Sequence, residues 1–143
     1  DLAYIGQEGE KKRAFVVHRS SIGAIERIMA FLIEHYAGAF PLWLAPVQAR
    51  VLSIGEKHNR YAHVVKDELK IAGIRAEVDD SSETLGKKIR DAKMQKIPYL
   101  LVVGAAEEEA QTATLESRDA GKIGALAVSE IVEKLKEEII SRG

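Results

Sequence analysis

The sequence contains no cysteine, which excludes disulfide frameworks, thiol nucleophiles and cysteine zinc clusters together. Long hydrophobic runs are also missing, because the longest, residues 97–104, is far shorter than the roughly 18 residues of a membrane helix. The first residues carry no signal-peptide pattern. A charge excess is absent too, since 21 basic residues stand against 22 acidic ones, so an acidic partner would need a local patch. We therefore expect a cytoplasmic protein with no membrane partner.

The apolar content of the sequence is that of a folded protein, because 46% of the 143 residues are apolar and can form one core. This length fits one ordinary domain, or one domain with a remnant of another. The sequence starts at Asp1 and not at methionine, so we expect a fragment or a processed piece.

The first third predicts a strand over residues 14–18 and then a helix over residues 22–36, capped by Ser20 or Ser21. Glycine and two prolines in residues 37–46 end the helix. This segment is too apolar for a solvated linker, so we interpret it as a connector that packs against something.

From residue 47 onward, strand and helix patterns alternate. They predict strands over 47–54, 74–78 and 99–103 and helices over 57–72 and 84–94. Two consecutive βαβ units of this kind form a three-layer α/β domain. Further predicted segments are a polar stretch over 105–111, a strand over 112–116, a loop over 118–124 and a terminal amphipathic helix over 128–139.

Few residues form a pattern that indicates a specific chemistry, and two interpretations stay open for each of them. His18 is a metal ligand or an ordinary polar residue, because no second ligand lies at a suitable spacing. Arg27 contacts a phosphate or pairs with an acidic neighbour. Residues 87–96 hold five cations and one acid, so they form either a phosphate-binding face or a solvated one. The glycine after residue 103 belongs to no dinucleotide or P-loop motif, so a mononucleotide is not expected there.

Two blocks of sequence carry a family resemblance. HRSSIGAIER (residues 18–27) and IEHYAGAFPLWLAPVQ (33–48) resemble the third signature motif and the connector of bacterial threonyl-tRNA synthetases, which are class II enzymes. LGKKIR (85–90), QKIPYLLVVG (95–104) and IVEKLKEEI (131–139) resemble their anticodon-binding domain. The resemblance implies a catalytic-domain remnant over 1–40, a connector over 41–46 and an anticodon-binding domain over 47–143. That domain would have a mixed, mostly parallel five-stranded sheet flanked by helices.

The resemblance also implies roles in a longer synthetase that uses ATP with magnesium and zinc to charge tRNA(Thr) with threonine. Arg27 would be the catalytic contact to the ATP γ-phosphate, and Gly23 would leave room for the nucleotide. His18 would be one of three zinc ligands, the other two lying upstream. The synthetase would be a homodimer with no DNA partner. We expect the fragment alone to be inactive and to bind neither zinc nor ATP tightly.

Residues implied to meet the anticodon stem-loop lie in the second half of the chain. They are Ser82, Lys87, Lys88, Lys93, Lys96, Glu107, Glu116 and Arg118. The chain departs from the family pattern at two of them. SET at 82–84 replaces the usual Asn-Glu-Lys, and Glu116 replaces a cation. An anion there removes a donor and adds repulsion, so restoring arginine is expected to tighten binding. The alternative is a non-catalytic accessory or interaction module derived from a synthetase.

Overall fold

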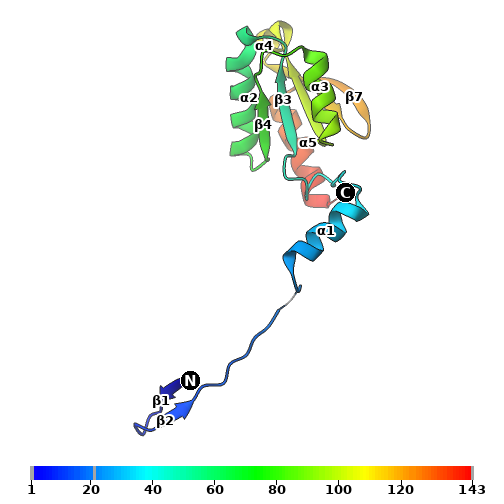
Figure 1. Ribbon diagram of the computed structural model, residues 1–143. Coiled ribbons are helices and arrows are strands. Elements are labelled where there is room, and N and C mark those ends of the chain that lie inside the picture. Colours follow the sequence, from blue (N-terminus) through cyan, green and yellow to red (C-terminus); the bar gives the residue numbers. More distant parts are fainter. Residues whose placement is uncertain (1, 21, 143) are drawn as a thin grey trace. The chain divides into compact units, whose positions relative to one another are not determined.

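The computed structural model describes residues 2–20 and 22–142, and contacts within the chain divide it into two compact units, residues 1–31 and 32–143 (Figure 1). The expected cap Ser21 lies outside the described residues. The Oγ atom of Ser20 accepts a hydrogen bond from the backbone N–H of Gly23 at 3.0 Å. Ser20 therefore satisfies a backbone donor just before the first helix.

The first unit begins with an antiparallel hairpin of β1 (Ala3–Ile5) and β2 (Lys11–Arg13). The strand expected over residues 14–18 is not formed, and the side chains of Phe15, Val16 and Val17 are exposed. A strand needs a neighbour for its backbone N–H and C=O groups. Among the described residues, no strand pairs with this segment. That prediction is therefore wrong for the chain as it stands.

The first helix is shorter than its apolar pattern indicates. α1 spans Ile25–His35, whereas residues 22–36 were expected. Gly23 has a φ of 74°, a left-handed conformation that cannot continue as α-helix, so the helix begins after it. Beyond the helix, Gly38 has a φ of 76° and its N–H donates to the carbonyl of Ile33 at 2.9 Å. This is a glycine-terminated helix end.

The second unit is built on one five-stranded sheet with the order β4-β3-β5-β6-β7. Its strands are β3 (Ala49–Ser53), β4 (Ala76–Asp79), β5 (Tyr99–Val103), β6 (Thr112–Ser117) and β7 (Gly121–Ala127). β3 pairs in parallel with β4 and β5, and the β5–β6 and β6–β7 pairings are antiparallel. The sheet is therefore mixed, and it confirms the predicted α/β class.

Helices cover both faces of this sheet. α2 (Asn59–Ile71), preceded by a short 3₁₀ turn η1 (Glu56–His58), and α5 (Val128–Ser141) pack on the face that contains Val51 and Leu101. α3 (Leu85–Met94) packs on the other face, over Leu52 and Leu100. Neighbouring residues of one strand point to opposite faces, so the central strands are apolar on both.

In the second unit, two elements have no counterpart in the prediction. α4 (Ala105–Ala110) lies in the expected polar stretch, and β7 includes much of the expected loop. Gly121 and Gly124 in β7 have φ values of 73° and 128°, and the register with β6 shifts between them, where Ile123 of β7 has no residue opposite it. Glycine lets an edge strand twist in this way while its sequence resembles a loop. In the described part of the chain, no helix is long and apolar enough to cross a membrane.

Candidate nucleic-acid interface

The carboxyl ends of β3, β4 and β5 meet at one edge of the sheet, where α4 also lies (Figure 1). Two expected contact residues are at this edge. Ser82 is exposed in the loop between β4 and α3, and half-buried Glu107 is on the first turn of α4. The topology therefore places at one edge of the sheet two residues that are 25 positions apart in the sequence.

Glu107 is held at both carboxylate oxygens. Its Oε2 accepts from the backbone N–H of Gly104 at 3.0 Å, and its Oε1 accepts from the hydroxyl of Thr114 at 2.9 Å. The first bond caps α4, and the second ties the carboxylate to β6. A carboxylate offers about four acceptor positions, so Glu107 still has acceptors for an incoming N–H group.

The loop that carries Ser82 has an ordered turn of its own. Oδ1 of Asp79 accepts from the N–H and the hydroxyl of Ser81, at 3.2 and 2.6 Å. Thr84 then caps α3, because its side chain accepts from the N–H of Lys87 at 3.4 Å. The N-terminus of α3 thus faces the same edge as Ser82. A helix N-terminus favours anions such as phosphate.

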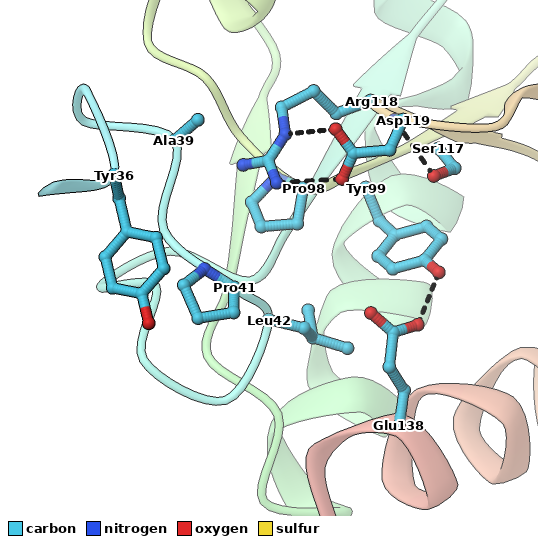
Figure 2. A pocket seen from close by; sticks show the side chains of 10 residues that line it. All are labelled: Tyr36, Ala39, Pro41, Leu42, Pro98, Tyr99, Ser117, Arg118, Asp119 and Glu138. Carbon is cyan, nitrogen blue, oxygen red and sulfur yellow. Dashed lines mark hydrogen bonds and ion pairs between the residues drawn. The ribbon is translucent and has the colours of Figure 1, made fainter. Parts of the chain in front are cut away.

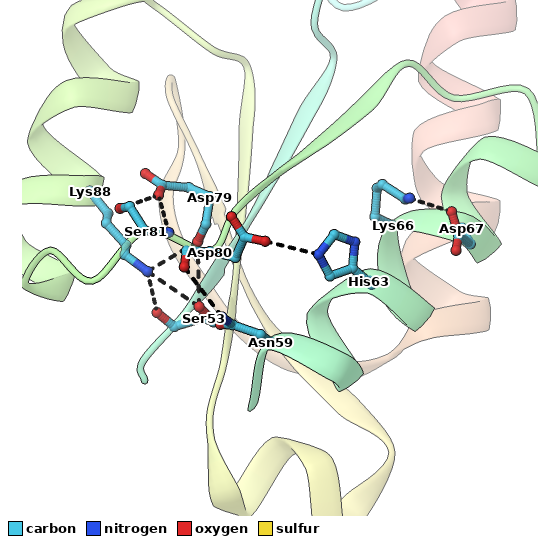
Figure 3. A network of polar contacts seen from close by, with 9 residues as sticks. All are labelled: Ser53, Asn59, His63, Lys66, Asp67, Asp79, Asp80, Ser81 and Lys88. Atoms are coloured by element: carbon cyan, nitrogen blue, oxygen red, sulfur yellow. Dashed lines mark hydrogen bonds and ion pairs between the residues drawn. The ribbon is translucent and has the colours of Figure 1, made fainter. Parts of the chain in front are cut away.

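Lys88 does not belong to this exposed surface, which corrects the expectation that it faces phosphates. It is 2% exposed, and its ammonium donates three hydrogen bonds inside the fold (Figure 3). The acceptors are the carbonyl of Ser53 at 3.0 Å, the Ser53 hydroxyl at 3.2 Å and the carbonyl of Asp79 at 3.1 Å. These bonds join the ends of β3 and β4. Lys88 is therefore a structural residue, with its three donors already used.

Lys87 and Lys93 are exposed cations on α3, and each holds an ion pair. Lys87 contacts Glu83 at 2.6 Å, one helical turn earlier, and this hydrogen bond raises the pKa of the lysine. Lys93 contacts Glu116 of β6 at 2.6 Å. Both lysine side chains are just over half exposed, so their remaining donors are open to a ligand.

Lys96 and Arg118 lie at the opposite end of the sheet, where β5 begins and β6 ends. The Lys96 ammonium donates to the carbonyl of Ala37, and Arg118 Nη1 donates to the carbonyls of Phe40 and Lys96 at 3.0 and 3.1 Å. Arg118 also pairs with Asp119 and lowers its pKa (Figure 2). The strand length separates these two cations from Glu107 by roughly 15 Å. Their donors hold the connector against the domain.

A cavity of about 230 Å³ lies at this second end, between the connector, the start of β5 and α5 (Figure 2). The phenol of Tyr99 donates to Oε2 of Glu138 at 2.6 Å across it. Burial raises the pKa of Tyr99, and the hydrogen bond to Glu138 raises it further. Pro41 and Leu42 of the connector form part of the wall, so the connector packs onto the domain.

The three residues expected to serve a catalytic centre are in the first unit. His18, Gly23 and Arg27 are all exposed. A methyl group at Gly23 would meet no atom of the described residues within 4 Å. Within residues 2–20 and 22–142, no three His, Cys, Asp or Glu side chains are grouped to hold a metal. The residues present do not make a zinc site by themselves.

Sequence reasoning missed two contacts at the first edge. Nδ1 of His58 lies 2.7 Å from Oε2 of Glu108, which joins η1 to α4. Beside it, the hydroxyl of Tyr61 donates to the carbonyl of Thr112 at 2.8 Å. These bonds position α4, and hence Glu107. The partners are about 50 residues apart, so no local signal in the sequence could have identified them.

Comparison with known proteins agrees with this architecture. The family described as "Anticodon binding domain" matches residues 48–138. The chain is 47% identical to the threonine–tRNA ligase of Clostridioides difficile over 142 residues and 49% identical to that of Caldanaerobacter subterraneus subsp. tengcongensis. These matches cover 99% of this chain and 22% of each ligase. The chain thus spans about a fifth of the length of these relatives.

A solved structure shows the same fold. The crystal structure of the RNA binding domain of threonyl-tRNA synthetase from Cryptosporidium parvum superposes with a TM-score of 0.76 and 36% sequence identity. The match covers 81% of this chain and 29% of that one. The fold and the family match define an anticodon-binding domain, and the chain belongs to that family. Among the relatives described above, it is similar to the domain carried by threonine–tRNA ligases.

Proposed function

We propose that this chain is the anticodon-binding part of a threonine–tRNA ligase and that it binds the anticodon stem-loop of tRNA(Thr). The observation that carries the proposal is the 47–49% identity to threonine–tRNA ligases across 97–99% of the chain. The matched region includes the sheet edge and α3, where the candidate contact residues lie. The complete ligase would activate threonine with ATP and transfer it to the tRNA.

The geometry of the first sheet edge supports this binding mode. Glu107 is a fixed acceptor that suits the N–H group of an unpaired base, and Ser82 adds an exposed hydroxyl. Lys87 and Lys93 on the adjacent helix would contact backbone phosphates. Base contacts give sequence preference and phosphate contacts fix the position of the RNA, and this edge together with the adjoining surface of α3 and β6 offers both kinds. We leave Lys88, Lys96 and Arg118 out of the contact surface because their donors serve the fold.

The first unit would contribute to the catalytic centre of the longer ligase. We propose that Arg27 contacts the γ-phosphate of ATP, that Gly23 leaves room for the nucleotide and that His18 supplies one ligand to zinc. A guanidinium suits a phosphate because it presents several donors in a fixed plane. Zinc would select threonine through its hydroxyl group when bound. The remaining ligands would have to come from other parts of the ligase.

Binding of synthetic RNA to the 143-residue chain tests the proposal. Fluorescence anisotropy would compare the anticodon stem-loop of tRNA(Thr), the same hairpin with its anticodon bases exchanged, and a DNA hairpin of equal length. We expect the threonine stem-loop to bind more tightly than either comparison. Equal binding of all three would contradict anticodon recognition. It would favour an accessory module in place of a ligase domain.

A further inference from the structure

The face of β6 that lies beside α3 carries polar side chains. Ala113, Leu115 and Ser117 are buried on one face of the strand, and the alternate residues Thr114 and Glu116 are half-buried on the other. Within the described residues, the apolar cluster beneath α3 includes side chains of β3, β5 and α3 and none of β6 or β7. On this face β6 therefore has a strip of polar side chains, in which Thr114 is bonded to α4 and Glu116 to α3.

Lys93 is held over this strip by Glu116. The ion pair joins Nζ of Lys93 to Oε1 of Glu116 at 2.6 Å, with the lysine side chain 54% exposed and the glutamate side chain 20% exposed. Glu116 is also fixed within the sheet, because it lies opposite Leu100 on β5 and Lys122 on β7. The anion is thus the rigid member of the pair, and the ammonium is the exposed member.

An ammonium has three donors, and Glu116 accepts from one of them. The other two donors of Lys93 remain directed away from the carboxylate and can reach a phosphate or a base acceptor. A free lysine on a helix surface would spend most of its time in other rotamers, and ordering it costs entropy. Fixing the ammonium in advance lowers the part of this cost that binding would otherwise include.

We propose that Glu116 is a positioning residue for RNA binding, which holds the Lys93 ammonium as a donor to the RNA beside β6. This inference rests on the proposed function and deepens it. It also reverses the sequence-based view of Glu116 as a lost donor and a source of repulsion. An arginine at position 116 would stand against Lys93, so it would displace the ammonium and would not simply add a contact.

The effect of Glu116→Gln on stem-loop affinity distinguishes the two interpretations, because they predict changes in opposite directions. If Glu116 only repels RNA, Glu116→Gln tightens stem-loop binding whatever residue is at position 93. If Glu116 positions Lys93, Glu116→Gln weakens binding about threefold when Lys93 is present. In a Lys93→Ala background the same change then has the opposite sign and tightens binding slightly. Lys93→Ala alone should weaken binding about tenfold and reduce the slope of log affinity against log salt by about 0.7.

The experiment is a double-mutant cycle on the 143-residue chain, with anisotropy titrations of the threonine stem-loop at several salt concentrations. Lys134→Ala is the control for net charge, because Lys134 is exposed on α5, which packs on the opposite face. We expect less than about a twofold change for it. Circular dichroism melts would verify that every variant folds. The exchanged pair, Lys93→Glu with Glu116→Lys, should bind more tightly than Lys93→Glu alone.

Two results would overturn the proposal. One is that Glu116→Gln tightens binding in both backgrounds, and the other is that Lys93→Ala leaves affinity and salt dependence unchanged. In either case the parent chain can still distinguish the threonine stem-loop, and the proposed function then stands without this inference. A parent chain that binds no stem-loop would overturn both.

Discussion

Replacing the buried Lys88 with methionine should destabilise the chain without removing an RNA contact. Methionine keeps most of the aliphatic stem but has no ammonium. The carbonyl of Ser53, its hydroxyl and the carbonyl of Asp79 would each lose a donor that now lies 3.0–3.2 Å away. A buried acceptor left without a partner costs about 1–3 kcal/mol. The loss is partly offset because a charge no longer has to be desolvated.

From these terms we expect Lys88→Met to reduce the free energy of unfolding by about 2–4 kcal/mol. Lys88→Ala also removes about three buried methylenes, at about 0.8 kcal/mol each, and should cost roughly 2 kcal/mol more. Urea unfolding, followed by the fluorescence of the single tryptophan, Trp43, measures both changes. Stem-loop titrations are made at a temperature where Lys88→Met and the parent are both folded. The slope of log affinity against log salt should then be the same for the two proteins.

The typical effect of a surface substitution on the free energy of unfolding is about 0.5 kcal/mol. If the unfolding free energy of Lys88→Met differs from that of the parent by less than this, the reasoning is refuted. Such a small difference would mean that the three hydrogen bonds contribute no net stability. If Lys88→Met reduces the slope of log affinity against log salt by about one, the Lys88 ammonium reaches a phosphate. That result would contradict the burial of Lys88.

Three further predictions concern other parts of the chain. Arg118→Lys should lower the free energy of unfolding, measured in urea, by about 1–2 kcal/mol, because lysine cannot reproduce the planar set of donors of arginine. Stem-loop affinity should stay within about twofold of the parent. A larger fall in affinity would show that Arg118 contacts the RNA. The raised pKa of Tyr99 means that its stabilising contribution is complete below about pH 10 and declines as the pH rises further. Tyr99→Phe, which removes the phenol bonded to Glu138, should therefore flatten this part of the alkaline unfolding profile, and an unchanged profile would contradict the assignment. Calorimetry should detect no tight zinc or ATP binding, because the described residues hold no group of three metal-ligand side chains and Arg27 would be one phosphate contact of several. Stoichiometric zinc binding at submicromolar affinity would show that the zinc site is more local.

The βαβ core was predictable from the sequence because hydrophobic periodicity determines it. Residues 99–103 form a continuous apolar run, as expected for a strand buried on both faces. The helices predicted over 57–72 and 84–94 are present as α2 (Asn59–Ile71) and α3 (Leu85–Met94). β7 was not predictable, because its two glycines indicate a loop. Only pairing with β6 makes a strand of it, and pairing is a property of the whole sheet.

The candidate site was only partly predictable from the sequence. The charge run over residues 87–96 correctly marked a basic helix, but its composition does not show which face each lysine occupies. Lys88 is one residue from the exposed Lys87, and this step turns the side chain by about 100° toward the sheet. The Lys93–Glu116 pair joins residues 23 positions apart, so only the fold could show it.

The most direct test of the central claim is to map the RNA-binding edge by NMR. Amide chemical shifts of the ¹⁵N-labelled chain would be followed as the threonine anticodon stem-loop is added. We expect the perturbations to concentrate on residues 81–93 and 104–116, which surround Ser82, Glu107 and Glu116. Perturbations concentrated instead on residues 37–46, Lys96 and Arg118, at the opposite end of the sheet, would contradict it.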